Sequence, residues 1–166
     1  MIIAALLAAA APAGPPKLIY CHMMECSWSR RVSNRLVARQ GAEQLREYVT
    51  IDGQSEHRGG DYPTRYSPRV RVKWEAKPVT TYVLCSKARP AIAFQDRWDP
   101  ASKGRWYGHY LDLFNLYGYN TSSAVIYAAA CHDIDFSEKA LKRLGYRSGT
   151  RSEQVDLRRP TDLLKR

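Results

Sequence analysis

The chain has 166 residues, 45% of them hydrophobic, and a formal net charge of +10. This hydrophobic content excludes wholesale disorder, and the length predicts a single domain. The positive balance favours anionic partners, although a need for solubility alone would also explain it.

Residues 1–13 form an apolar run of mostly small side chains that ends in Ala-Pro-Ala. This pattern predicts the hydrophobic segment and cleavage site of a secretory signal peptide, and hence a periplasmic or secreted protein. The run is shorter than the about 20 apolar residues that span a bilayer. No Lys or Arg precedes it, so the alternative is a buried N-terminal helix of a cytosolic protein.

The first half of the remaining chain mixes one helical pattern with two alternating patterns. Residues 28–40 predict an amphipathic helix, because Trp28, Val32 and Leu36 recur at helical spacing; a strand is the alternative. Residues 45–52 and 69–74 alternate apolar and polar side chains and predict strands. The Gly- and Pro-rich segment 53–68 between them predicts a loop.

The second half predicts further strands followed by helices. Strands are expected over 80–86, 91–95 and 105–113, where β-branched and aromatic side chains gather. Residues 120–123 predict a cap for a helix over 124–131, and Ser137 and Gly145 frame another helix. Residues 146–166 are polar and basic, which predicts a loosely ordered tail.

Four cysteines in an exported chain predict two disulfides. We favour Cys85–Cys131, which would join a strand to a helix, together with a local Cys21–Cys26 bridge. The alternative pairs Cys21 or Cys26 with Cys85. The expected fold is therefore α+β, a small central antiparallel sheet with two or three short helices, stapled by disulfides. One globular domain is expected over residues 17–145.

The cysteines also admit a metal site, since Cys and His ligands suit zinc or copper. Cys21-His22 and Cys131-His132 are adjacent pairs, and Glu25 and Cys26 follow the first of them. Neither pair has the usual ligand spacing, and export favours disulfides over thiolates. No metal and no cofactor is therefore expected.

Catalytic motifs are missing from the sequence. It contains no nucleophile elbow, phosphate-binding loop, zinc-protease helix or dinucleotide fingerprint. A thiol such as Cys26 beside His22 or His109 would be a nucleophile only if it stayed reduced. No catalytic residue is predicted, and a hydrolase with dispersed catalytic residues stays as an alternative.

Arginine and aromatic side chains gather in the expected loops and on strand faces. Arginine binds phosphate and carboxylate groups in a bidentate geometry, and tyrosine and tryptophan are frequent at interfaces. The alternative is that the rings belong to the core and the charges blunt an edge strand. The predicted anionic and aromatic binding surface consists of Arg65, Tyr66, Arg69, Arg71, Lys73, Arg105, Trp106 and Tyr107.

These features favour a small exported, disulfide-stabilised binding protein rather than an enzyme. Its expected partner is an anionic polymer of the cell envelope or an acidic protein. Nucleic acid is disfavoured, because exported proteins rarely meet it. A secreted hydrolase and a Cys/His metal-binding protein are the alternatives.

Overall fold

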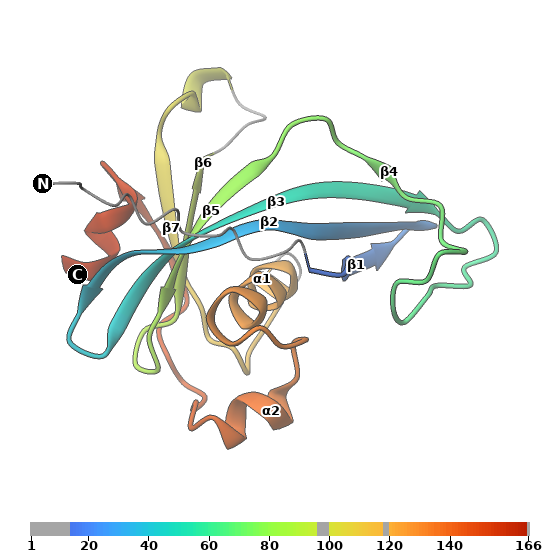
Figure 1. Ribbon diagram of the computed structural model, residues 1–166. Coiled ribbons are helices and arrows are strands. Elements are labelled where there is room, and N and C mark those ends of the chain that lie inside the picture. The colour runs from blue at the N-terminus through green and yellow to red at the C-terminus, as the bar shows by residue number, and fades with distance from the viewer. Residues whose placement is uncertain (1–13, 96–99, 118–119, 166) are drawn as a thin grey trace, which may run out of the picture.

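An antiparallel sheet of eight strands is the main element of the computed structural model, which describes residues 14–95, 100–117 and 120–165. The strand order is β1-β2-β3-β5-β6-β7-β8, and β4 pairs with the far part of β3 (Figure 1). The α+β class is confirmed, but the sheet is larger than the small one expected. The strands are β1 (Lys17–His22), β2 (Glu25–Gln40), β3 (Glu43–Glu56), β4 (Lys73–Trp74), β5 (Val79–Cys85), β6 (Ala91–Gln95), β7 (Trp106–Tyr110) and β8 (Glu153–Leu157).

The helix expected over residues 28–40 is wrong, because this segment belongs to β2 and pairs with β3 along its length. Two register shifts, one between Arg31 and Ser33 and one between Leu36 and Ala38, interrupt the alternation of the strand. Each bulge inserts a residue, so the apolar spacing imitates a helical period. Val32 and Leu36 are 40% and 42% exposed, and thus belong to no buried helix face.

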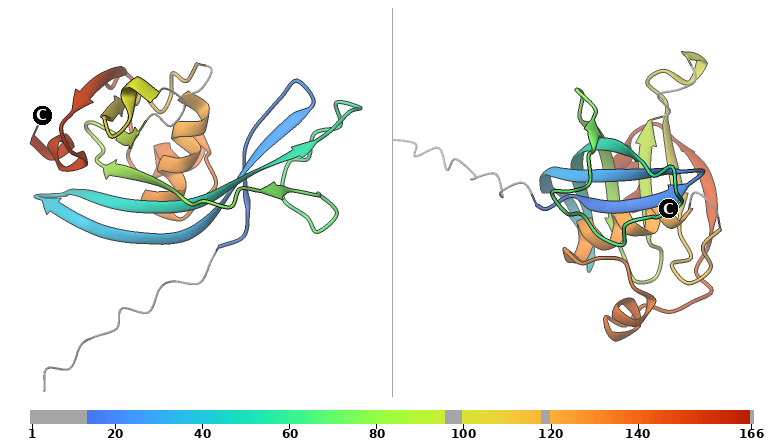
Figure 2. Two further views of the ribbon diagram at one scale, coloured as in Figure 1. Left: turned by 90° about the horizontal axis from the view of Figure 1, so that it is seen from above. Right: turned by 90° about the vertical axis from the view of Figure 1, so that its right-hand side faces the viewer.

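The β1–β3 part of the sheet extends beyond the layer of helices (Figure 2). Its far end carries the connection between β3 and β4, which we call the distal loop (residues 57–72). The strand predicted over 69–74 is wrong for residues 69–72, which lie in this loop, and only Lys73 and Trp74 pair with β3. The predicted loop over 53–68 begins only after β3 ends at Glu56.

The two helices predicted in the second half of the chain are present. Helix α1 (Asn120–His132) lies against one face of the sheet, and α2 (Glu138–Arg143) follows it (Figure 1). The side chain of Ser137 accepts a hydrogen bond from the Ala140 amide, as expected of an N-cap. Gly145 has a φ of 87°, the left-handed conformation that ends helices.

Two clusters of buried side chains lie on opposite faces of the sheet, since Val83 and Leu84 are neighbours on β5 but belong to different clusters. The first lies between the sheet and α1 and includes Tyr48, Val83, Ile92, Leu111, Leu113, Tyr127 and Leu141. The second lies under the C-terminal segment and includes Leu45, Leu84, Ala93, Tyr110, Leu157, Leu163 and Leu164.

The C-terminal segment is not the loosely ordered tail that its composition predicts. Its strand β8 pairs with β7, and the 3-10 helix η2 (Pro160–Lys165) buries Leu163 and Leu164 against the second cluster. Arg89 donates hydrogen bonds to the carbonyl oxygens of both leucines, at 3.0 and 3.1 Å, and the same guanidinium binds the Glu43 carboxylate. These long-range contacts order the segment.

The favoured disulfide pairing is present. Cys21–Cys26 links residues directly opposite each other on β1 and β2, and Cys85–Cys131 joins β5 to α1. Two disulfides are typical of exported proteins. The signal peptide expected over residues 1–13 lies outside the described residues. Within the described ranges, no helix has the length and apolar composition needed to cross a bilayer.

Candidate anion-binding site

The base of the distal loop is held against Gly53 of β3. The backbone pairs Gly53 with Trp74 of β4, and the loop passes so close that a Cβ at residue 53 would lie 2.6 Å from Val72 Cγ1. Only glycine leaves room for this approach. The contact fixes where the loop leaves the sheet and therefore where its arginines lie.

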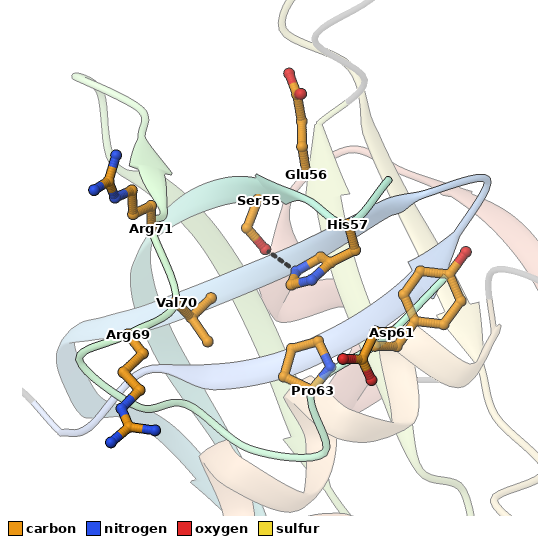
Figure 3. Close-up of a pocket in the computed structure, with 9 residues that line it drawn as sticks. Ser55, Glu56, His57, Asp61, Pro63, Arg69, Val70 and Arg71 are labelled. Atoms are coloured by element: carbon orange, nitrogen blue, oxygen red, sulfur yellow. Dashed lines mark hydrogen bonds between the residues drawn. The ribbon is translucent and has the colours of Figure 1, made fainter. Parts of the chain in front are cut away.

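A hollow of about 440 Å³ lies between the end of β3 and the distal loop (Figure 3). The Ser55 and His57 side chains meet at its floor, while the guanidinium groups of Arg69 and Arg71 point outward at its rim. The lining consists of Ser55, Glu56, His57, Asp61, Tyr62, Pro63, Arg69, Val70 and Arg71.

The floor of the hollow is fixed by a chain of hydrogen bonds. The buried Trp28 indole donates to Ser55 Oγ at 2.7 Å, and Ser55 Oγ lies 2.8 Å from His57 Nε2. Because the indole can only donate, Ser55 Oγ accepts from Trp28, while the tautomer of the His57 ring sets which partner donates in the second bond. The backbone amide of His57 donates to the Met24 carbonyl, which links the floor to the β1–β2 turn.

The lining of the hollow carries charges of both signs, with the guanidinium groups of Arg69 and Arg71 at the rim and the carboxylates of Glu56 and Asp61 also present. Arg65, Arg69 and Arg71 are exposed, and no carboxylate of the described residues forms an ion pair with them. Arg58, by contrast, lies 3.5 Å from Glu56. Unpaired guanidinium groups beside one hollow are suited to bidentate binding of phosphate or carboxylate groups.

The predicted binding surface divides into two parts in the structure. Arg65, Tyr66, Arg69 and Arg71 lie in the distal loop and Lys73 in β4 next to it. Tyr66 packs edge-on against Trp28, with ring centroids 5.8 Å apart. These five residues share one end of the molecule.

Arg105, Trp106 and Tyr107 lie elsewhere, at the start of β7. The Trp106 ring packs edge-on against Tyr82 at 5.2 Å, and the Tyr107 hydroxyl donates to Ser102 Oγ. Trp106 and Tyr107 therefore both have partners within the molecule. The structure does not bring this group together with the distal loop.

Sequence reasoning missed Ser55 and His57, and also the apolar β1–β2 turn beside them. Ser55 and His57 are separated by one residue, so on an extended backbone their side chains share a face. That spacing was the available signal. The contact with the β1–β2 turn depends on the register of three strands, which no local pattern reveals.

A second hollow, of about 470 Å³, lies beside the Cys85–Cys131 disulfide. There His132 Nε2 lies 2.7 Å from the Tyr146 hydroxyl, which lies 3.0 Å from the Tyr127 hydroxyl. Burial, and then the Lys87 charge, lower the pKa of His132. The network ends on the backbone of Ser86 and ties α1 to β5, so we interpret it as structural.

The described residues give little support to nucleophilic or thiolate chemistry. All four cysteines are in disulfides, so none supplies a thiolate ligand or a thiol nucleophile. Ser55 is only 4% exposed, and no carboxylate of the described residues bonds to the ring of its neighbour His57. No group of three His, Cys, Asp or Glu in these ranges is placed to hold a metal ion.

The chain matches no protein-family model, no curated protein and no solved structure.

Proposed function

We propose that the protein is an exported, disulfide-stabilised binding protein that holds an anionic partner of the cell envelope against the distal loop. The observation that carries this proposal is the pair of exposed arginines without ion-pair partners, Arg69 and Arg71, at a hollow whose floor is fixed, with Arg65 exposed in the same loop. A fixed floor lowers the entropy lost on binding, and free guanidinium groups supply charge-assisted hydrogen bonds.

The test is binding of labelled polyphosphate, as a soluble anionic polymer, at low and at high salt. The R69Q/R71Q variant should bind at least about tenfold more weakly at low salt, because each charge-assisted hydrogen bond contributes about 1.5–3 kcal/mol. Wild-type affinity should fall steeply as salt rises.

The matched control is R105Q/R158Q, which removes two exposed arginines outside the distal loop. It changes net charge equally, so a site at the distal loop predicts near wild-type binding. Equal loss in both variants would mean that net charge alone drives binding. An affinity that ignores salt would contradict the electrostatic proposal.

A further inference from the structure

The turn between β1 and β2 carries two exposed methionines in an unusual backbone conformation. Met23 and Met24 have φ angles of 48° and 66°, and they are 76% and 52% exposed. A two-residue hairpin turn with positive φ at both positions normally takes Asn-Gly, because a Cβ is disfavoured there. We call these two residues the methionine tip; neither backbone preference nor burial in this chain accounts for them.

The methionine tip is held firmly in place. The Cys21–Cys26 disulfide bridges the strands one pair before the turn. The Met24 amide donates to the Tyr62 hydroxyl at 2.9 Å, and the Met24 carbonyl accepts from the His57 amide at 2.6 Å. Strained, over-determined segments of this kind gather at functional sites.

The surroundings of the methionine tip combine aromatic and cationic groups with the carboxylates of Glu56 and Asp61, which line the same hollow. Tyr62, which bonds to the tip, lines the same hollow as Arg69 and Arg71. Tyr20 and Tyr62 are 41% and 39% exposed. Tyrosines favour the headgroup level of a membrane, and arginines bind lipid phosphates while their alkyl stems stay in apolar surroundings.

We infer, building on the proposed function, that the anionic partner is the surface of a bilayer that contains anionic phospholipids. Met23 and Met24 enter the boundary between headgroups and acyl chains, and Arg69 and Arg71 bind lipid phosphates. A protruding tip with flexible thioether side chains suits a fluid surface, which closes around it without a matching pocket. A polar polyanion would leave the methionines without a role.

The experiment measures partitioning onto vesicles of phosphatidylglycerol and phosphatidylcholine, and onto vesicles of phosphatidylcholine alone. The variant M23N/M24G carries the residues that this turn prefers, so it should fold at least as well as wild type. Its partitioning onto the anionic vesicles should weaken at least about tenfold, because the two apolar side chains that would enter the bilayer are removed. R69Q/R71Q should weaken it about 25-fold, since each basic residue near an anionic surface contributes about a factor of five.

The matched control is L36T/V37T, which removes two similarly exposed apolar side chains, 42% and 37%, at the other end of β2. It should partition like wild type. Polyphosphate binding separates the two proposals, because M23N/M24G should keep it while R69Q/R71Q should lose it.

Wild-type partitioning by M23N/M24G, with loss in R69Q/R71Q, would overturn the membrane inference and leave the proposed function standing. Undiminished polyphosphate binding by R69Q/R71Q would overturn the proposed function itself. The protein could instead fail to bind vesicles and bind a polyglutamate chain in a way that depends on Met23 and Met24. That result would overturn the membrane inference and identify an acidic protein as the partner.

Discussion

At the scale of single residues, two partly buried histidines make the fold sensitive to acid. Burial lowers the pKa of His109, and burial with the Lys87 charge lowers that of His132, from the ordinary value of 6.5. Below pH 6.5 these two imidazoles bind protons more readily in the unfolded chain than in the folded chain. The free energy of unfolding therefore falls as pH drops from 6.5 to the lower folded pKa values, and is unaffected by these groups above 6.5.

We expect the urea midpoint of unfolding to fall between about pH 7 and about pH 5, and to fall less in H132Q. Gln lacks the titrating ring but can still bond to the Tyr146 hydroxyl, which His132 contacts at 2.7 Å. The control is H22Q, which removes an exposed imidazole. A pH profile of H132Q that matches wild type would show that this histidine does not contribute.

Among the helices and strands, local sequence patterns correctly predict those whose signals lie within a few neighbouring residues. Strand β6 agrees with the prediction over 91–95, and the Ser137 cap marks the start of α2. Strand β2 was mistaken for a helix because two bulges break its alternation. The sequence nominates the arginines of the candidate site but not the hollow, because a hydrogen bond between the Met24 and His57 backbones joins segments far apart in sequence.

The distal loop and β4 approach Gly53 of β3 closely. A Cβ in G53A would meet Val72 Cγ1 at 2.6 Å and Trp74 Cε3 at 2.7 Å, so β4 must shift. We expect the free energy of unfolding to fall by about 1–3 kcal/mol, as in other overpacked sites. Polyphosphate binding should weaken too, because the loop leaves the sheet at this point.

The control for G53A is G59A, within the distal loop itself. A Cβ there meets no atom within 4 Å, so its stability should change by less than about 0.5 kcal/mol. The double variant G53A/V72A removes the clashing methyl group and should recover part of the loss. Identical unfolding and binding curves for G53A and G59A would contradict the importance of this packing.

In the whole molecule, a disulfide and a set of hydrogen bonds join helices and strands that lie far apart in the sequence. The Cys85–Cys131 disulfide fixes α1 to β5, and Arg89 fixes η2 to the opposite face. The order of the C-terminal segment was not predictable from its composition, since it depends on a guanidinium about seventy residues away. The long Cys85–Cys131 link and the short Cys21–Cys26 link should therefore differ in their effects.

The two disulfides should differ in stability and in function. In the chain-entropy model the Cys85–Cys131 bridge, with a sequence separation of 46, contributes about 4 kcal/mol, and the Cys21–Cys26 bridge, with a separation of 5, about 2 kcal/mol. Urea unfolding should accordingly show a larger loss in C85A/C131A than in C21A/C26A. Since the free energy of unfolding of a whole domain is only about 5–15 kcal/mol, both losses are measurable.

Vesicle binding should follow the opposite order. Of the two disulfides, only Cys21–Cys26 constrains the methionine tip, so C21A/C26A should partition more weakly onto anionic vesicles at a temperature where it remains folded. C85A/C131A, measured where it too is folded, should partition like wild type, because neither Cys85 nor Cys131 belongs to the β1–β2 hairpin. Equal partitioning by the two variants would mean that a rigid tip is not needed for membrane binding.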